Sequence, residues 1–297
     1  MPFATMMVHV DVDPPADERI RLAGKLAARF DATLIGASAW EPRPPLTYGG
    51  MVVDPKITED MLQGISARLG QVGEHFRTLV GCDWTVEWRS AIDSPTEFLV
   101  REARAADLLI VGRDRIAGDS SRSLDPGTVL LKAGRPVLVV PPDIPPLMAE
   151  RIVIGWKGTR EARRAVRDSP PLLRQATNVT IVEIAEPQDR DQSRLRIDDV
   201  AQYLTRHQVK SAKPAISNAT GSVAGELLRI AGEQKADLIV AGGYGHNRLG
   251  EWLFGGVTNG FLEASQKSSS KRARCAVCYH TNQQTVRGGA KTGPAAT

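Results

Sequence analysis

The chain is poor in cysteine and contains no long apolar run. Its three cysteines, Cys82, Cys275 and Cys278, are too few for a disulfide scaffold and fit a reducing compartment. No apolar stretch approaches the roughly 20 residues that a membrane-spanning helix needs. The amino terminus has no basic segment before its apolar residues, unlike a secretory signal. We therefore expect a cytoplasmic protein that has no membrane partner.

Aromatic residues are scarce as well, and so is concentrated positive charge. Aromatic side chains make up 5% of the chain, and 38 Lys and Arg against 34 Asp and Glu leave a net charge of only +4. Part of this excess lies in the serine-rich segment 267–274, which has few aromatic neighbours that could stack on bases. We interpret the segment as solvated and expect no nucleic-acid partner.

The common catalytic and metal-binding signatures are absent too. The chain contains no GxxxxGK[ST] loop, no GxSxG elbow and no HExxH helix. Asp11 and Asp13 form only a weak acid/base pair, since nothing in the sequence predicts the burial that would separate their pKa values. The single CxxC of Cys275 and Cys278 supplies too few ligands for a structural zinc site. We assign no catalytic residue and no metal ligand.

What the chain does contain is an alternation of strand and helix patterns. Met6–Val12 and Thr33–Ala39 have the composition of strands, and helical spacing separates them from Ala16 onward. Strand, helix, strand in this order predicts a parallel sheet with right-handed crossovers. The pattern continues with strands at Trp84–Trp88, Leu108–Val111 and Arg135–Val140, and with helices at Ile57–Val80 and Thr96–Ala105.

The same order then begins again at Arg151. The clearest match is ADLLIVG at 106–112 against ADLIVAG at 236–242. The repeat predicts two tandem α/β domains, joined by a stiff proline-rich linker near 141–149. We place the domains at 1–144 and 150–280, followed by a polar tail, 281–297, that we expect to be disordered.

The carboxyl end departs from this repeat. Val137, in an apolar strand, follows Gly127 after ten positions, whereas ten positions after Gly255 the chain is polar and serine-rich. Either Cys275–Tyr279 supplies a fifth strand after a longer loop, or the second sheet lacks that strand. A frameshift near the end of the sequence would leave the same pattern.

A glycine-rich segment follows the apolar run Leu238–Ala241. Gly242 and Gly245 are separated by two residues, and Gly255 follows after nine more. Such a loop between the end of a strand and the start of a helix brings bare backbone N–H groups and a positive helix dipole together. The segment therefore predicts a phosphate site, with a flexible turn as the alternative.

The pattern G-x2-G-x9-G-[small]-x-T resembles the nucleotide signature of the universal stress protein family, in its ATP-binding branch. It departs at Gly256, where the family usually has Ser or Thr. Tandem copies also occur in that family, so the resemblance covers nearly the whole chain. It implies two flavodoxin/Rossmann-like domains, each a five-stranded parallel sheet of order 3-2-1-4-5 with helices on both faces. The nucleotide would lie across the carboxyl ends of strands one and four.

The resemblance implies a site for ATP, with or without Mg²⁺, in the second domain. Lys157 stands where family members commonly have Asp, which implies either contact with phosphate or weakened adenosine recognition; a solvated surface lysine is the alternative. Thr258 could equally cap the following helix. The implied contact residues are Gly242, Gly245, His246, Gly255, Gly256, Val257, Thr258, Lys157, Gly158, Thr159 and Ile184.

The first domain has the family aspartate, as Asp11, but its loop lacks the second glycine. Arg113, Asp114 and Arg115 follow Gly112, and a side chain at Arg115 would crowd a backbone cradle. We expect a degenerate first site that serves structure or dimerisation.

These features predict a stress-response protein that senses an adenine nucleotide in its second domain without rapid turnover. One alternative is a slow ATPase or phosphotransferase, for which Asp237 is the first candidate carboxylate, although it precedes its strand and so belongs to the wrong end. Another is a scaffold that binds no nucleotide and acts through a regulatory protein partner. A monomer with two packed copies and a homodimer both remain open.

Overall fold

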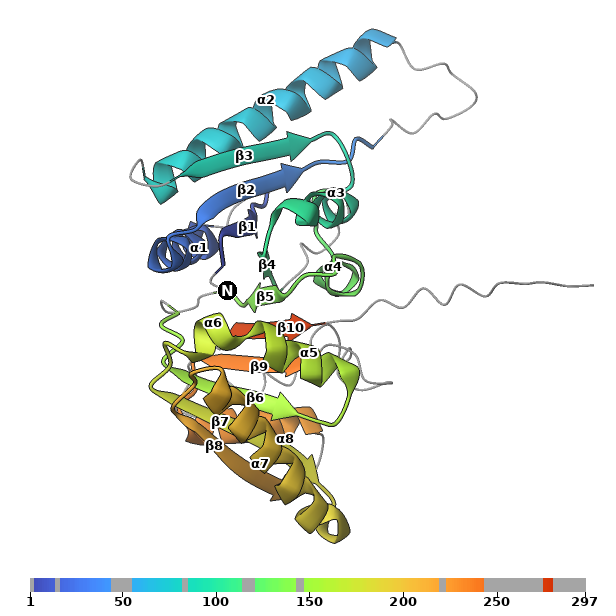
Figure 1. Cartoon of the computed structure of the whole chain (residues 1–297). Coiled ribbons are helices and arrows are strands. Elements are labelled where there is room, and N and C mark those ends of the chain that lie inside the picture. The colour runs from blue at the N-terminus through green and yellow to red at the C-terminus, as the bar shows by residue number, and fades with distance from the viewer. Residues whose placement is uncertain are drawn as a thin grey trace, which may run out of the picture.

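The computed structural model describes residues 3–13, 17–43, 55–81, 85–113, 121–142, 147–218, 223–242 and 275–279. Within these ranges ten strands form one sheet, which helices cover on both faces (Figure 1). The strands are β1 (Thr5–His9), β2 (Thr33–Ala39), β3 (Val86–Ala91), β4 (Leu108–Gly112), β5 (Val137–Val140), β6 (Arg151–Trp156), β7 (Asn178–Ala185), β8 (Ala212–Asn218), β9 (Leu238–Gly242) and β10 (Cys275–Tyr279). The α-helices are α1 (Asp17–Phe30), α2 (Pro55–Val80), α3 (Pro95–Glu102), α4 (Pro126–Lys132), α5 (Arg160–Asp168), α6 (Pro170–Leu173), α7 (Arg190–Arg206) and α8 (Val223–Glu233).

The strand order is β3-β2-β1-β4-β5-β10-β9-β6-β7-β8. The first half contributes the parallel set β3-β2-β1-β4-β5, and the second half contributes the parallel set β8-β7-β6-β9. β10 lies between the sets, parallel to β9 and antiparallel to β5.

The α/β class is therefore confirmed, but the expectation of two separate five-stranded sheets is wrong. Five strands form the set of the first half, and β6 to β9 form a parallel set of four in the second half, with all ten strands in one sheet. The alternative in which Cys275–Tyr279 supplies a further strand is confirmed, because β10 pairs parallel to β9. The physical reason lies at the junction. Without β10, β5 and β9 would each present a row of unpaired main-chain groups, and β10 bonds to both.

Side chains of the central strands point alternately into two apolar layers. Met6 and Val8 pack on the side of α1 and α2, where Ile20 and Phe76 are fully buried. Met7 packs on the other side, in the layer that α3 and α4 cover. Because both faces are covered, these strands have no polar face and form continuous apolar runs in the sequence.

Most predicted strands and helices are present, with bounds that differ by a few residues. β1 ends at His9 rather than Val12, and β3 is displaced toward the carboxyl terminus relative to the predicted Trp84–Trp88. The sequence pattern predicts neither α7 nor β8. α7 buries only four of its 17 residues, one of them a serine, and β8 is a half-exposed edge strand that contains Lys213 and Pro214, so neither has the apolar content that marks a core helix or strand.

The internal repeat extends to individual hydrogen bonds. Asp107, just before β4, accepts bonds at Oδ2 from the amides of Ala4 (2.9 Å) and Thr5 (3.1 Å) at the start of β1. Asp237, just before β9, accepts bonds from the amides of Glu150 and Arg151, both at 3.1 Å, at the start of β6. Each carboxylate therefore holds the start of the neighbouring central strand.

These bonds fix the same register in both halves. Met6 lies opposite Leu108 in the first half, and Ile152 lies opposite Leu238 in the second. Asp11 follows Thr5, and Lys157 follows Arg151, by the same number of residues. The two residues therefore occupy equivalent places after β1 and β6.

Replacing Asp237 by Ala should lower the free energy of unfolding by about 1–2 kcal/mol, because two main-chain amides lose a charged acceptor at a solvent-accessible position. Asp107→Ala should act in the same direction with similar size. Urea unfolding followed by circular dichroism measures both, with Asp199→Ala on the exposed face of α7 as the control. An effect at Asp237 no larger than at Asp199 would contradict this role.

Candidate functional site

The candidate site lies at the carboxyl ends of β6 and β9. β6 pairs with β7 on one side and with β9 on the other, so the chain connections diverge at this point. In open α/β sheets, ligands bind at such switch points, outside the carboxyl ends of the strands. The chain leaves β6 at Trp156, passes through Lys157, Gly158 and Thr159, and enters α5.

The first turn of α5 is held by Thr159. Its Oγ1 accepts a hydrogen bond from the amide of Ala162 at 3.3 Å, and its own amide donates to the carbonyl of Lys157 at 2.6 Å. Thr159 is therefore the N-cap of α5. Gly158 is exposed, and a Cβ built on it would meet no atom within 4 Å, so the space beside the cap is open.

Gly242, the first glycine of the predicted loop, has a packing role in the described structure. A Cβ at this position would lie 2.6 Å from Ala162 N and 2.7 Å from the carbonyl carbon of Glu161. The first turn of α5 therefore rests directly on the end of β9, an approach that only glycine permits. The sequence pattern assigned Gly242 to phosphate, and it does not reveal this helix contact.

The structure also describes three other predicted contact residues, Lys157, Gly158 and Ile184. Lys157 is exposed and forms no ion pair with any residue that the structure describes. Gly158 O is held by Arg163, whose Nη1 donates to it at 3.2 Å. Ile184 lies near the end of β7, opposite Ser217 of β8, and its half-buried side chain packs on the α8 side of the sheet. The loop Lys157–Thr159 is thus brought to the switch point, and Ile184 lies on the next strand.

The remaining predicted contact residues lie outside the described part of the chain. They are Gly245, His246, Gly255, Gly256, Val257 and Thr258. The structure therefore describes the strand that leads into the glycine loop and the helix beside it, and the predicted phosphate contacts of the loop itself stay predictions.

The equivalent point of the first half is occupied by a buried ion pair. Arg19, in the first turn of α1, donates from Nη2 to Asp11 Oδ2 at 2.5 Å and from Nε to the carbonyl of His9 at 3.0 Å. The Arg19 residue is only 8% exposed. The sequence carries no local signal for this contact, because Arg19 meets Asp11 only once the chain has folded and the start of α1 lies beside the end of β1.

Burial sets the protonation of this cluster. Burial lowers the pKa of His9 to about 4, with Arg19 acting in the same direction and Asp11 opposing it. Burial alone would raise the pKa of Asp11, but the charges of Arg19 and His9 and the hydrogen bond from Arg19 hold it below its usual value. At neutral pH the cluster therefore contains a neutral imidazole beside a carboxylate and guanidinium pair.

The protein should lose stability as the pH falls from 7 to 5. His9 takes up a proton near pH 6.5 when unfolded but only near pH 4 when folded, so the unfolded state binds more protons between these values. The expected contribution of His9 is about 2 kcal/mol over this interval. Asp11, whose folded pKa is lowered, adds a further loss only in stronger acid.

Urea unfolding at pH 7, 6 and 5 tests this prediction. His9→Gln should flatten the pH dependence, because it removes the buried group that titrates differently in the folded and unfolded states. The interpretation fails if His9→Gln keeps the slope of the wild type.

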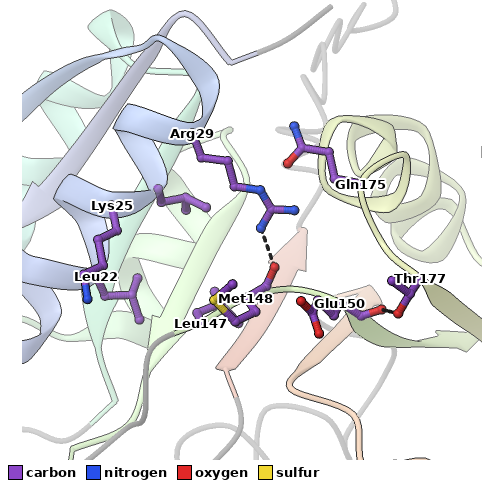
Figure 2. Close-up of a pocket in the computed structure, with 9 residues that line it drawn as sticks. Leu22, Lys25, Arg29, Leu147, Met148, Glu150, Gln175 and Thr177 are labelled. Atoms are coloured by element: carbon purple, nitrogen blue, oxygen red, sulfur yellow. Dashed lines mark hydrogen bonds between the residues drawn. The ribbon is translucent and has the colours of Figure 1, made fainter.

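A separate cavity lies at the opposite end of the strands, between α1 and the segments that precede β6 and β7 (Figure 2). It has a volume of about 450 Å³ and is lined by residues from both halves, among them Leu26, Arg29, Met148, Glu150 and Gln175. Arg29 crosses it to donate a hydrogen bond to the carbonyl of Met148 (Figure 2). Because it lies near the starts of β6 and β7, this cavity is distinct from the candidate site.

Two further features of the described residues bear on function. No group of three or more His, Cys, Asp or Glu in the described ranges is arranged to hold a metal ion. None of the described helices combines the length and the apolar composition that crossing a bilayer requires.

Comparison with known proteins links the second half to one family. The model of the Universal stress protein family matches residues 148–268, which include β6 to β9 and the glycine segment. No curated protein matches the chain.

Solved structures resemble the chain over nearly its whole length. A universal stress protein from Archaeoglobus fulgidus DSM 4304 has a TM-score of 0.60 at 13% identity, covering 93% of this chain and 95% of that one. A functionally unknown protein from Pseudomonas aeruginosa PAO1 has a TM-score of 0.55 at 14% identity, covering 93% and 92%. At these identities the likeness is one of fold. The described part of the chain thus has an α/β fold like that of these structures, and residues 148–268 also match the model of the universal stress protein family by sequence.

Proposed function

We propose that the second half binds an adenine nucleotide, ATP in the first instance, at the carboxyl ends of β6 and β9. The chain would act through this ligand as a nucleotide-dependent regulator in a stress response. The family match over residues 148–268 supports this proposal, because it spans both the β6–α5 loop and the glycine segment.

The observation that carries the proposal is the contrast in charge between the two switch points. In the first half a carboxylate is paired with a buried guanidinium. In the second half the equivalent residue is Lys157, which is exposed and has no ion-pair partner among the described residues. An unpaired cation beside the amino end of a nine-residue helix favours an anionic ligand such as a polyphosphate.

In this proposal Lys157 contacts phosphate, and Gly158 leaves room for the ligand to approach the main chain. The loop residues Gly245, His246 and Gly255 to Thr258 would complete the phosphate contacts, and the base would lie toward the end of β7 near Ile184. Mg²⁺ would accompany the phosphates where it is needed. With a lysine in place of a carboxylate, affinity should depend on the phosphates more than on the nucleoside.

Asp237 does not suit the catalytic role that an ATPase or phosphotransferase would require. It lies before β9, at the opposite end of the strand from the candidate site, and its carboxylate holds the main chain at the start of β6. An enzyme acting at the candidate site would therefore need another carboxylate. We propose binding without rapid turnover.

Lys157→Glu should weaken ATP binding at least tenfold, because it replaces an attractive charge by a repulsive one beside the phosphates; tenfold corresponds to about 1.4 kcal/mol. Isothermal titration calorimetry with ATP at fixed salt measures the change. Lys210→Glu is the matched control, since Lys210 is exposed just before β8, at the other end of the sheet, and should leave affinity unchanged.

A second variant separates the loop from the lysine. Gly245→Trp should abolish binding, and nucleotide released from the denatured wild type should be absent from this variant when both are measured by mass-detected chromatography. If wild-type protein carries no nucleotide and millimolar ATP does not raise its melting temperature, the proposal is wrong and a scaffold function takes its place.

A further inference from the structure

Arg19 fills the switch point of the first half. Its guanidinium is bound on two sides, by the carbonyl of His9 and by the carboxylate of Asp11. The residue is 8% exposed although it carries a full charge, and a charge buried to this degree needs such partners. The contact therefore requires a specific slot in the protein rather than a loose surface ion pair.

The end of β4 forms the third side of this slot. A Cβ built on Gly112 would lie 2.1 Å from Arg19 Nη1, so the guanidinium occupies the space directly over this glycine. Gly112 has no positive φ, so an alanine there would be excluded by Arg19 and not by backbone strain. A carbonyl, a carboxylate and a bare glycine surface together suit a planar cation with several donors.

We propose that the carboxyl ends of β1 and β4 form a guanidinium-binding site whose occupant is the chain's own Arg19. The occupied site is closed to nucleotides, because a phosphate would have to displace Arg19 and would then face the carboxylate of Asp11. This inference concerns the first half and stands independently of nucleotide binding by the second.

The second half keeps the strand-end glycine but lacks both charged members of this arrangement, the carboxylate and the arginine. Gly155 lies at the place of His9, and Lys157 lies at the place of Asp11. The third residue of the helix is Ala162 instead of Arg19, and its main-chain nitrogen is the atom that approaches the strand-end glycine, Gly242. The closed and open switch points thus differ through residues at equivalent positions of the repeat.

Rescue by an external guanidinium ion tests the proposal on the full chain. Arg19→Ala should lower the melting temperature by roughly 10 °C, because it leaves the largely buried carboxylate of Asp11 without its guanidinium partner. Guanidinium chloride at about 20 mM, well below denaturing concentrations, should recover a substantial part of this loss in Arg19→Ala. The same concentration of sodium or tetramethylammonium chloride should not.

Arg21→Ala is the matched control, because Arg21 lies on the same helix with its side chain 52% exposed. It should melt close to the wild type and should not respond to guanidinium. The proposal is overturned if Arg19→Ala melts like Arg21→Ala, or if guanidinium shifts all variants equally.

A double-mutant cycle provides a test that does not depend on Arg19→Ala folding. Gly112→Ala should lower the melting temperature by several degrees in the wild type, since the new methyl group must expel the guanidinium. In Arg19→Lys, whose ammonium keeps the charge but has no Nη1 over β4, the same change should cost much less. Equal costs in the two backgrounds would mean that Arg19 does not occupy the space over Gly112.

Discussion

The register of the central strands depends on one interaction that the chain makes twice, between a carboxylate before the fourth strand and the amides that begin the first. Asp107 and Asp237 each make two such bonds. Together with the apolar pattern and the main-chain ladders, these bonds hold the register that brings particular residues to the carboxyl ends of the central strands. The scaffold of both switch points is therefore the same, and their difference lies in the side chains that the scaffold presents there.

The two halves use this common scaffold with opposite charges. The first half places a carboxylate after its central strand and pairs it with Arg19, so this position is occupied and largely buried. The second places Lys157 at the equivalent position and leaves it in solvent. Each strand-end glycine admits a different neighbour, a guanidinium over Gly112 and the main chain of α5 over Gly242. The first half thus fills this position with its own Arg19, and the second half leaves the equivalent position open to solvent.

Features that depend on a short stretch of sequence could be predicted, whereas contacts between distant segments could not. The repeat of 106–112 at 236–242 predicted β4 and β9 and the place of Lys157, because apolar runs and their following glycines are visible in the sequence. α7 and β8 were missed because they bury little, and the role of Gly242 in seating α5 required a helix contact that no spacing reveals. Arg19 could not be identified for the same reason, since its partners meet it only after the chain has folded.

The junction between the halves has a consequence for access. β5 and β10 run antiparallel, and each is parallel to the strand beside it, β4 and β9. The two switch points, at the ends of β4 and β9, therefore belong to strands that run in opposite senses across this junction. Each switch point is thus built from the strands of its own half.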